Sequence, residues 1–145
     1  MPKPRDRSEL TVPSRTEALA RVREFVRAQA LRSGFSEDQV DQIVIAVDEA
    51  CTNIIKHAYG GDASQRIRIR VEAHSDRLEI VLLDRGKMFD EAAYQEPDLA
   101  ALIRTGHRGG LGLMLMRRLM DAVRYEHRNG TNMVRLIKYH RCTPP

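Results

Sequence analysis

The sequence predicts a two-layer α/β (α+β) sandwich, in which helices pack on one face of a mostly antiparallel, mixed sheet. The prediction rests first on the order of elements along the chain, which reads β-α-α-β-β-loop-α-β-β. It rests also on the last two strands, near 123–127 and 131–139, because Asn129-Gly130 between two strand patterns is a strong hairpin signal. At 145 residues the chain has the size of one domain with its own core.

A short edge strand and a first helix are expected at the N-terminal end. The strand is predicted at 10–12, and the helix that follows closes near Gly34. Apolar residues recur at helical spacing along this helix: Leu19, Val22, Phe25 and Val26.

The second helix is predicted from a start signal and a stop signal. Ser36 and Gln39 have the spacing of a capping box, and Gly60-Gly61 ends the helix. Five apolar residues form its core stripe: Val40, Ile43, Val47, Ala50 and Ile54.

Two strands are expected next, at 66–73 and 77–84, with a turn around Ser75-Asp76 between them. In the second strand the apolar residues share one face with Asp84, whereas Glu79 marks the other face as the wetter one. Asp84 therefore continues the buried side of its strand, where a carboxylate without a donor is unfavourable. We expect this carboxylate to receive a hydrogen bond from a ligand.

A loop and a third helix complete the pattern. Residues 85–108 are predicted to be a mobile loop with some helical content near 90–94, and an apolar helix then runs from 111 to 120. The domain is expected at 9–140, between flexible tails at 1–8 and 141–145.

Composition excludes several classes of protein. No segment has the pattern of a signal peptide or the length of a membrane span, and two cysteines form neither a disulfide framework nor a metal-ligand spacing. We therefore expect a soluble, cytoplasmic protein. The net charge of +4 raises the question of nucleic acid, but Arg66, Arg68 and Arg70 alternate with apolar residues as on a solvated strand face. Without Trp and with few other aromatics, the chain lacks stacking platforms, so nucleic-acid binding is not expected.

The second helix carries a pair of polar residues whose types suit an active site. Glu49 and Asn53 are four residues apart and so point the same way, with Lys56 one turn further on. A proton acceptor beside a neutral oxygen ligand suits a site that handles a proton and a hard metal ion such as Mg²⁺. Taken alone, the pair is more consistent with a solvated polar face than with an active site.

Three motifs in order give the pair its meaning. The stretch from Glu49 to Tyr59 reads Glu-Ala-Cys-Thr-Asn-Ile-Ile-Lys-His-Ala-Tyr, and Asp84-Arg85-Gly86 and then Gly109-Gly110-Leu111-Gly112-Leu113 follow it. With these boxes in register the chain resembles the Bergerat-fold (GHKL) ATPases, and within them the bacterial anti-sigma-factor serine/threonine kinases. The resemblance covers about 10–139 and implies an ATP-binding fold with a mobile ATP lid.

The resemblance implies a role for each matched residue. Glu49 would be the general base, Asn53 would ligate Mg²⁺, and Asp84 would accept the hydrogens of the adenine amino group. Gly86 would let the backbone approach the base. Many relatives carry a second glycine where this chain has Met88, a difference that affects the hinge of the lid.

A second group of matched residues is expected at the phosphates. Glycines at the start of an apolar helix offer free N–H groups and a helix dipole that favour anions. The residues assigned to this part of the nucleotide site are Arg108, Gly109, Gly110, Leu111, Gly112 and Leu113. Thr131 matches a threonine that lies near the adenine in the family, whereas His57 is expected to be structural.

The function implied is an ATP- and Mg²⁺-dependent serine/threonine kinase that also acts as an anti-sigma factor. Its expected partners are a sigma factor and a STAS-domain antagonist, which it would phosphorylate on serine, and a homodimer is expected. Two alternatives remain open. One is a nucleotide-dependent interaction module without kinase activity, and the other is the catalytic half of a histidine kinase, although no helix pair with a phospho-acceptor His is evident.

Overall fold

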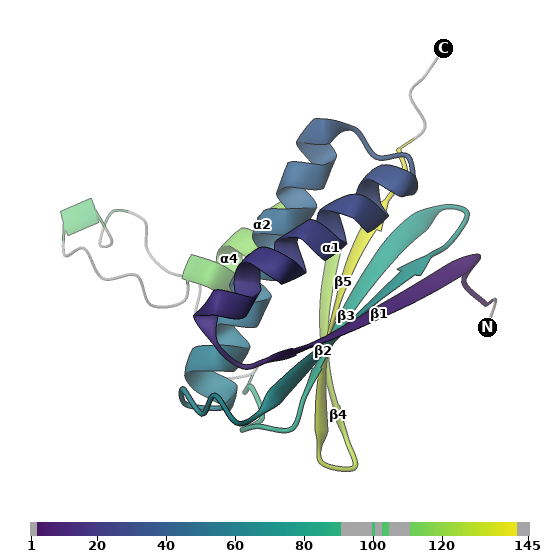
Figure 1. The fold of residues 1–145 in the computed structure, drawn as a ribbon. Helices are drawn as coiled ribbons and strands as arrows, with labels where there is room; N and C mark the ends of the chain where they lie inside the picture. The colour runs from purple at the N-terminus through teal and green to yellow at the C-terminus, as the bar shows by residue number, and fades with distance from the viewer. Residues whose placement is uncertain (1–2, 91–99, 101–102, 105–110, 142–145) are drawn as a thin grey trace.

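A single antiparallel sheet forms one layer of the molecule. The computed structural model describes residues 3–90, 100, 103–104 and 111–141, and Figure 1 shows the fold. The strands are β1 (Asp6–Pro13), β2 (Arg66–Ala73), β3 (Arg77–Asp84), β4 (Ala122–Arg128) and β5 (Thr131–Tyr139). Their order in the sheet is β1-β2-β3-β5-β4, and every pairing is antiparallel. The described sheet is thus antiparallel throughout rather than mixed.

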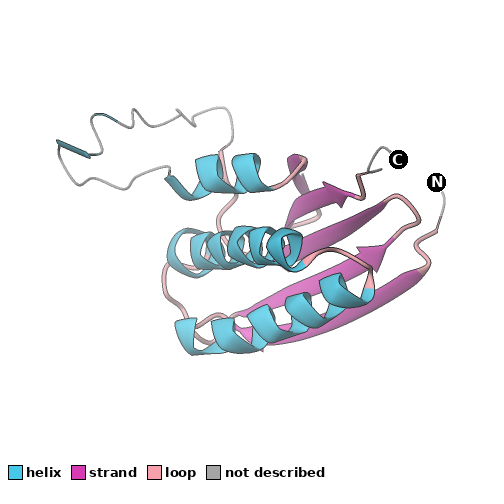
Figure 2. Ribbon diagram, turned by 90° about the horizontal axis from the view of Figure 1, so that it is seen from above, coloured by secondary structure: helices cyan, strands magenta, loops and turns pink. Residues whose placement is uncertain are grey.

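Three helices form the second layer, on one face of this sheet, as Figure 2 shows. They are α1 (Leu19–Arg32), α2 (Glu37–Asn53) and α4 (Leu111–Leu119), with a 3₁₀ turn η1 (Thr16–Ala18) before α1 and a π-helical turn η2 (Ile54–Ala58) after α2. Helix α2 contacts both other helices and lies between them. The predicted two-layer α/β architecture is confirmed. Among the residues that the structure describes, none of the helices could span a lipid bilayer.

The predicted start signal of α2 and the predicted turn of the hairpin are both present in the structure. The Ser36 hydroxyl accepts from the Gln39 backbone N–H at 3.2 Å, while the Gln39 side chain accepts from the Ser36 backbone N–H at 3.1 Å. In the β4–β5 hairpin, Asn129 and Gly130 have φ values of 53° and 77°. Positive φ at both central residues defines the type I′ turn, whose twist matches the strands beside it.

Strand β1 is longer than predicted. It begins at Asp6 rather than at residue 10, so residues 6–8 belong to the sheet and not to a flexible tail. Asp6 pairs with Ala73, and its carboxylate accepts from Arg32 of α1 at 3.2 Å. The polar composition of these residues hid the strand, because an edge strand is held by backbone pairing and does not need apolar side chains.

The core lies between the sheet and the helices. The predicted stripe of α2 is buried in full, and α2 packs against β3 and β5. The prediction that Glu79 lies on a wet face is wrong, because Glu79 is only 5% exposed. The face of the sheet that the helices leave free carries its own buried layer, in which Val81 and Ile137 lie beside the side chain of Glu79.

Candidate active site

The C-terminal end of α2 forms one wall of a pocket of about 890 Å³. Glu49 and Asn53 are half-buried and both line it, off the core stripe as predicted. A Cβ placed on Gly112, in the first turn of α4, would lie 2.8 Å from Glu49 Oε2 and 3.7 Å from both side-chain atoms Oδ1 and Nδ2 of Asn53. The two polar side chains thus converge on one point beside the glycine backbone. Glycine at 112 leaves room for the carboxylate.

Beyond Asn53 the helix widens into the π-helical turn η2. The Tyr59 backbone N–H donates to the Ile54 carbonyl at 2.9 Å, five residues back, as in a π-helix. Lys56 and His57 on this turn are exposed and line the pocket. His57 therefore lies at the candidate site, whereas the structural role expected for it belongs to Tyr59.

Tyr59 fastens the end of this turn to two strands. Its hydroxyl donates to the Arg66 carbonyl at 2.8 Å and accepts from the Arg85 backbone N–H at 2.7 Å. Burial raises the pKa of Tyr59, which keeps the hydroxyl protonated and able to donate. The connection fixes η2 against the end of β3, next to Asp84.

Asp84 is held by two donors on one of its oxygens. The Gly86 backbone N–H donates to Asp84 Oδ1 at 2.9 Å, and the Asn132 side-chain amide donates to the same atom at 2.8 Å. Asp84 is 6% exposed and lines the pocket. No hydrogen bond within the described residues engages its Oδ2, so this oxygen has the free acceptor capacity that a ligand amino group needs.

Asn132 is a functional residue that the sequence reasoning missed. It lies directly opposite Asp84 in the β3–β5 ladder and lines the pocket. The alternation of side chains along the strand could have identified it, because Asn132 shares the inward face of β5 with Val134 and Leu136. Like Asp84, Asn132 is a polar residue that continues the buried face of its strand.

The structure shows a packing reason for glycine at position 86 that was not predicted from the sequence. A Cβ at this position would overlap the backbone carbonyl of Ala58, which also accepts from the Lys87 N–H at 2.7 Å. The close approach is therefore between the end of β3 and the π-helical turn. Gly86 itself does not line the pocket, whereas Lys87, Met88 and Phe89 do.

An aromatic pair closes another side of the pocket. The rings of Phe89 and Tyr125 are stacked with centroids 4.5 Å apart and an interplanar angle of 28°. Both residues line the pocket, and Tyr125 lies on β4. An apolar wall of this kind suits the flat face of a heterocyclic base.

The remaining predicted residues divide into three groups. Gly112 and Leu113 line the pocket, and Leu111 begins α4. Thr131, expected beside the adenine, lines a separate hollow on the sheet that it shares with Asp84: successive side chains of a strand point to opposite faces, and Asn132 takes the inward position. Arg108, Gly109 and Gly110 lie outside the described residues, as does most of the predicted lid helix at 90–94.

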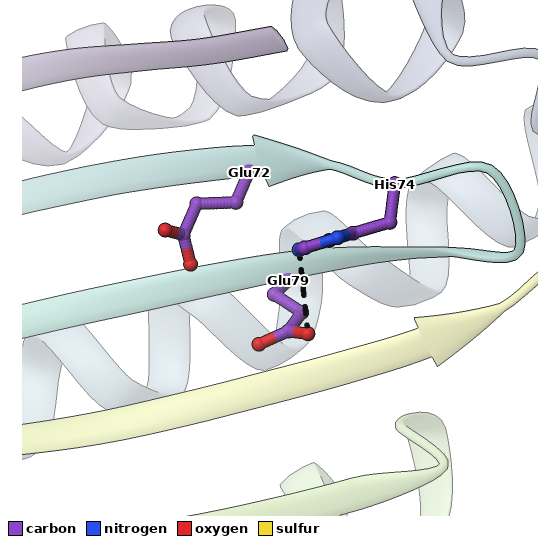
Figure 3. Close-up of side chains that lie close together, drawn as sticks. All are labelled: Glu72, His74 and Glu79. Carbon is purple, nitrogen blue, oxygen red and sulfur yellow. Dashed lines mark ion pairs between the residues drawn. The ribbon is translucent and has the colours of Figure 1, made fainter. Parts of the chain in front are cut away.

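A separate acidic cluster lies away from this pocket. Glu72, His74 and Glu79 come together on the free face of the sheet, as Figure 3 shows. Arg135 donates to both glutamates and Arg77 donates to Glu79 at 2.6 Å. Because these guanidinium groups already neutralise the carboxylates, we interpret the cluster as an ion-pair network and not as a metal site.

Fold and site together define the class of the protein. Residues 12–138 match the family described as the histidine kinase-like ATPase domain. This match spans most of the chain, which therefore belongs to that family of ATPase domains. The predicted family is confirmed.

Two relatives are identical to this chain at more than a third of the aligned residues. The chain is 37% identical over 139 residues to the serine-protein kinase RsbW of Bacillus subtilis (strain 168), covering 92% of this chain and 86% of that protein. It is 38% identical over 126 residues to the serine-protein kinase RsbW of Halalkalibacterium halodurans, covering 84% of this chain and 76% of that one.

Solved structures show the same fold. The crystal structure of the RsbU and RsbW domains of a Mycobacterium tuberculosis protein superposes with a TM-score of 0.65 at 19% identity, covering 92% of this chain and 31% of that one. The crystal structure of the SiaB–SiaC complex of Pseudomonas aeruginosa superposes with a TM-score of 0.56 at 13% identity, covering 92% of this chain and 89% of that one.

Proposed function

We propose that this protein is an ATP-dependent serine/threonine protein kinase and anti-sigma factor of a partner-switching pathway. The observation that carries the proposal is the convergence of Glu49 and Asn53 on the backbone of Gly112, at the wall of a pocket that also contains Asp84. The pocket thus combines a base, a neutral oxygen ligand and an acceptor for an amino group. The relatives named serine-protein kinase, at 37% and 38% identity, support the same reaction.

The pocket residues fit the substrate ATP. Asp84 Oδ2 is available to accept from the adenine amino group, and the stacked Phe89 and Tyr125 offer an apolar wall for the base. The volume of about 890 Å³ lies in the range of pockets that bind nucleotide-sized ligands. The N-terminal turn of α4, with Gly112 and Leu113 in the pocket lining, is suited to phosphate groups.

The donor set also fits a magnesium ion. A carboxamide oxygen is a ligand type that Mg²⁺ accepts, and we assign Asn53 to that role. An ion held by Asn53 would neutralise charge on the triphosphate.

We assign Glu49, whose side chain lines the pocket, the role of catalytic base. In the proposed reaction it takes the proton from a serine hydroxyl of the partner, while the serine oxygen forms a bond to the γ-phosphorus. The bond from that phosphorus to the bridging oxygen breaks, and ADP leaves. Phosphoryl transfer depends mainly on positioning and charge stabilisation, so a base, a metal ligand and a phosphate-binding turn are a sufficient set.

The partners are proposed from the resemblance and the relatives. The kinase substrate would be a STAS-domain antagonist, and a sigma factor would be the protein released when the antagonist binds. We also propose a cytoplasmic homodimer. Because a fold does not determine its partner-binding surfaces, each assignment needs its own test. Co-purification tests the two partners, and light scattering tests the homodimer.

The central test is a phosphorylation assay. The purified protein is incubated with Mg·ATP labelled at the γ-phosphate and with each STAS-domain protein encoded in the same genome. We expect phosphoserine on one of them. In Glu49→Gln the transfer should fall at least about a hundredfold, since removal of a general base costs roughly 10²–10⁴ in rate. Glu24→Gln, an exposed residue of α1, is the matched control and should keep full activity.

The alternatives give different results in the same assay. ATP binding without phosphoserine on any STAS-domain protein would contradict the kinase assignment and favour the interaction module. Acid-labile phosphate on the protein would instead identify a phosphohistidine and a histidine kinase.

A further inference from the structure

His127 lies at the end of a chain of side-chain contacts that leads to Asp84. It is on β4, directly opposite Asn132 of β5, and Asn132 is directly opposite Asp84 of β3. Three neighbouring strands thus place a histidine, an amide and a carboxylate in one row across the sheet. All three residues line the candidate pocket.

The orientation of the Asn132 amide is fixed by its neighbours. Its Nδ2 lies 2.8 Å from Asp84 Oδ1, 2.9 Å from the Gly86 carbonyl and 3.4 Å from the Lys87 carbonyl. All three atoms are acceptors, so only the NH₂ group can face them, and the amide oxygen must point the other way.

The amide oxygen meets the imidazole of His127. The distance between Asn132 Oδ1 and His127 Nδ1 is 2.7 Å. Because the amide oxygen is an acceptor, Nδ1 must carry the hydrogen, which assigns the Nδ1–H tautomer to the neutral ring. Without this donor the amide would lose the contact that opposes rotation of its NH₂ group away from Asp84.

We propose that His127 is a positioning residue for recognition of the base. It holds the Asn132 amide, the amide holds Asp84 Oδ1, and Oδ2 is thereby presented to the amino group of adenine. The proposal rests on the proposed function, in which this pocket binds ATP. A guanine would bring its carbonyl oxygen to the same carboxylate, so the row of contacts favours ATP over GTP.

The experiment compares nucleotides that differ only at the base amino group. Binding of ATP and of purine riboside triphosphate, which lacks that group, is measured by calorimetry on the full chain. In the wild type we expect ATP to bind about tenfold tighter, the effect of one good hydrogen bond. In His127→Phe we expect this preference to fall to about threefold or less. His127 is exposed on one side, so water replaces part of the lost contact.

A rescue variant and a control variant separate positioning from general damage. His127→Gln retains an N–H donor and should keep most of the preference. Arg124→Gln, also on β4 but on the free face of the sheet, should keep all of it. Thermal unfolding by circular dichroism establishes that each variant is folded.

Two further measurements test whether His127 acts through Asn132. Because His127 acts through Asn132, the double variant His127→Phe/Asn132→Ala should lose no more preference than Asn132→Ala alone. Nuclear magnetic resonance of the neutral imidazole should show the hydrogen on Nδ1. An Nε2–H tautomer, or a full wild-type preference in His127→Phe, would overturn the inference. Failure of the wild type to bind ATP would instead overturn the proposed function.

Discussion

The carboxylate of Glu49 occupies the space beside the backbone of Gly112, where a methyl group would lie 2.8 Å from Glu49 Oε2. Two sequence motifs separated by more than fifty residues therefore meet as one surface, with the glycine of one accommodating the charged group of the other. A change at this contact should therefore affect the position of the Glu49 carboxylate, and with it the activity, more than the stability of the fold.

Gly112→Ala should reduce activity without reducing stability. The added methyl group meets the flexible end of Glu49, which can rotate away, and alanine is the better helix former by about 1 kcal/mol. A displaced base costs roughly a hundredfold in rate. We expect the free energy of unfolding to change by less than about 1 kcal/mol while phosphoryl transfer falls at least tenfold. Full activity in this variant would contradict the assignment of Glu49 as the base.

Gly86→Ala, in contrast to Gly112→Ala, should reduce the stability of the protein. Its methyl group would overlap the carbonyl of Ala58, a backbone atom that cannot rotate away. Overpacking of this kind costs about 1–3 kcal/mol, which urea denaturation would measure. Gly112→Ala serves as the matched comparison. A stability equal to that of the wild type would show that the two segments separate easily.

Glu79→Gln should change how stability depends on pH. Burial alone would raise the pKa of Glu79, but hydrogen bonds from Arg77 and Arg135 outweigh it and hold the pKa below its ordinary value. A carboxyl whose pKa is lower in the folded state stabilises the protein above its unfolded pKa, and this contribution is lost as the pH falls through the folded pKa. The wild type should therefore lose stability below about pH 4.5 more steeply than the variant.

At neutral pH the same substitution should cost about 1–3 kcal/mol, because Arg77 and Arg135 each lose one of their charged partners. Urea denaturation at several pH values measures both effects, and Glu24→Gln is the exposed control. Parallel pH profiles for Glu79→Gln and the wild type would contradict the pairing of Glu79 with Arg77 and Arg135.

Cys51 should be inert in the folded protein. It is fully buried, and burial followed by the nearby charge of Asp48 raises its pKa to about 12. In a Cys142→Ser variant, which leaves Cys51 as the single thiol, a thiol reagent at pH 8 should react only after denaturant is added. Rapid reaction in native buffer would show that α2 opens locally.

Much of the fold could be predicted because its signals are local. Strands β2 and β3 were expected at 66–73 and 77–84 and lie at those residues, since alternation of side chains along a strand is visible in sequence. The capping box at Ser36 and the turn at Asn129-Gly130 were found for the same reason. Each depends on residues a few positions apart.

The sequence alone determined the two-layer fold, the family and the chemical types at the site: a carboxylate and an amide on one helix, a carboxylate on a buried strand face, and glycines at a helix start. Only the tertiary structure decided that Asn132 donates to Asp84, that Glu79 is buried and paired with two arginines, and that Gly86 packs against the carbonyl of Ala58. The physical reason is that these outcomes depend on which strands become neighbours and how closely two backbones approach. Neither property is encoded in the spacing of residues along one segment.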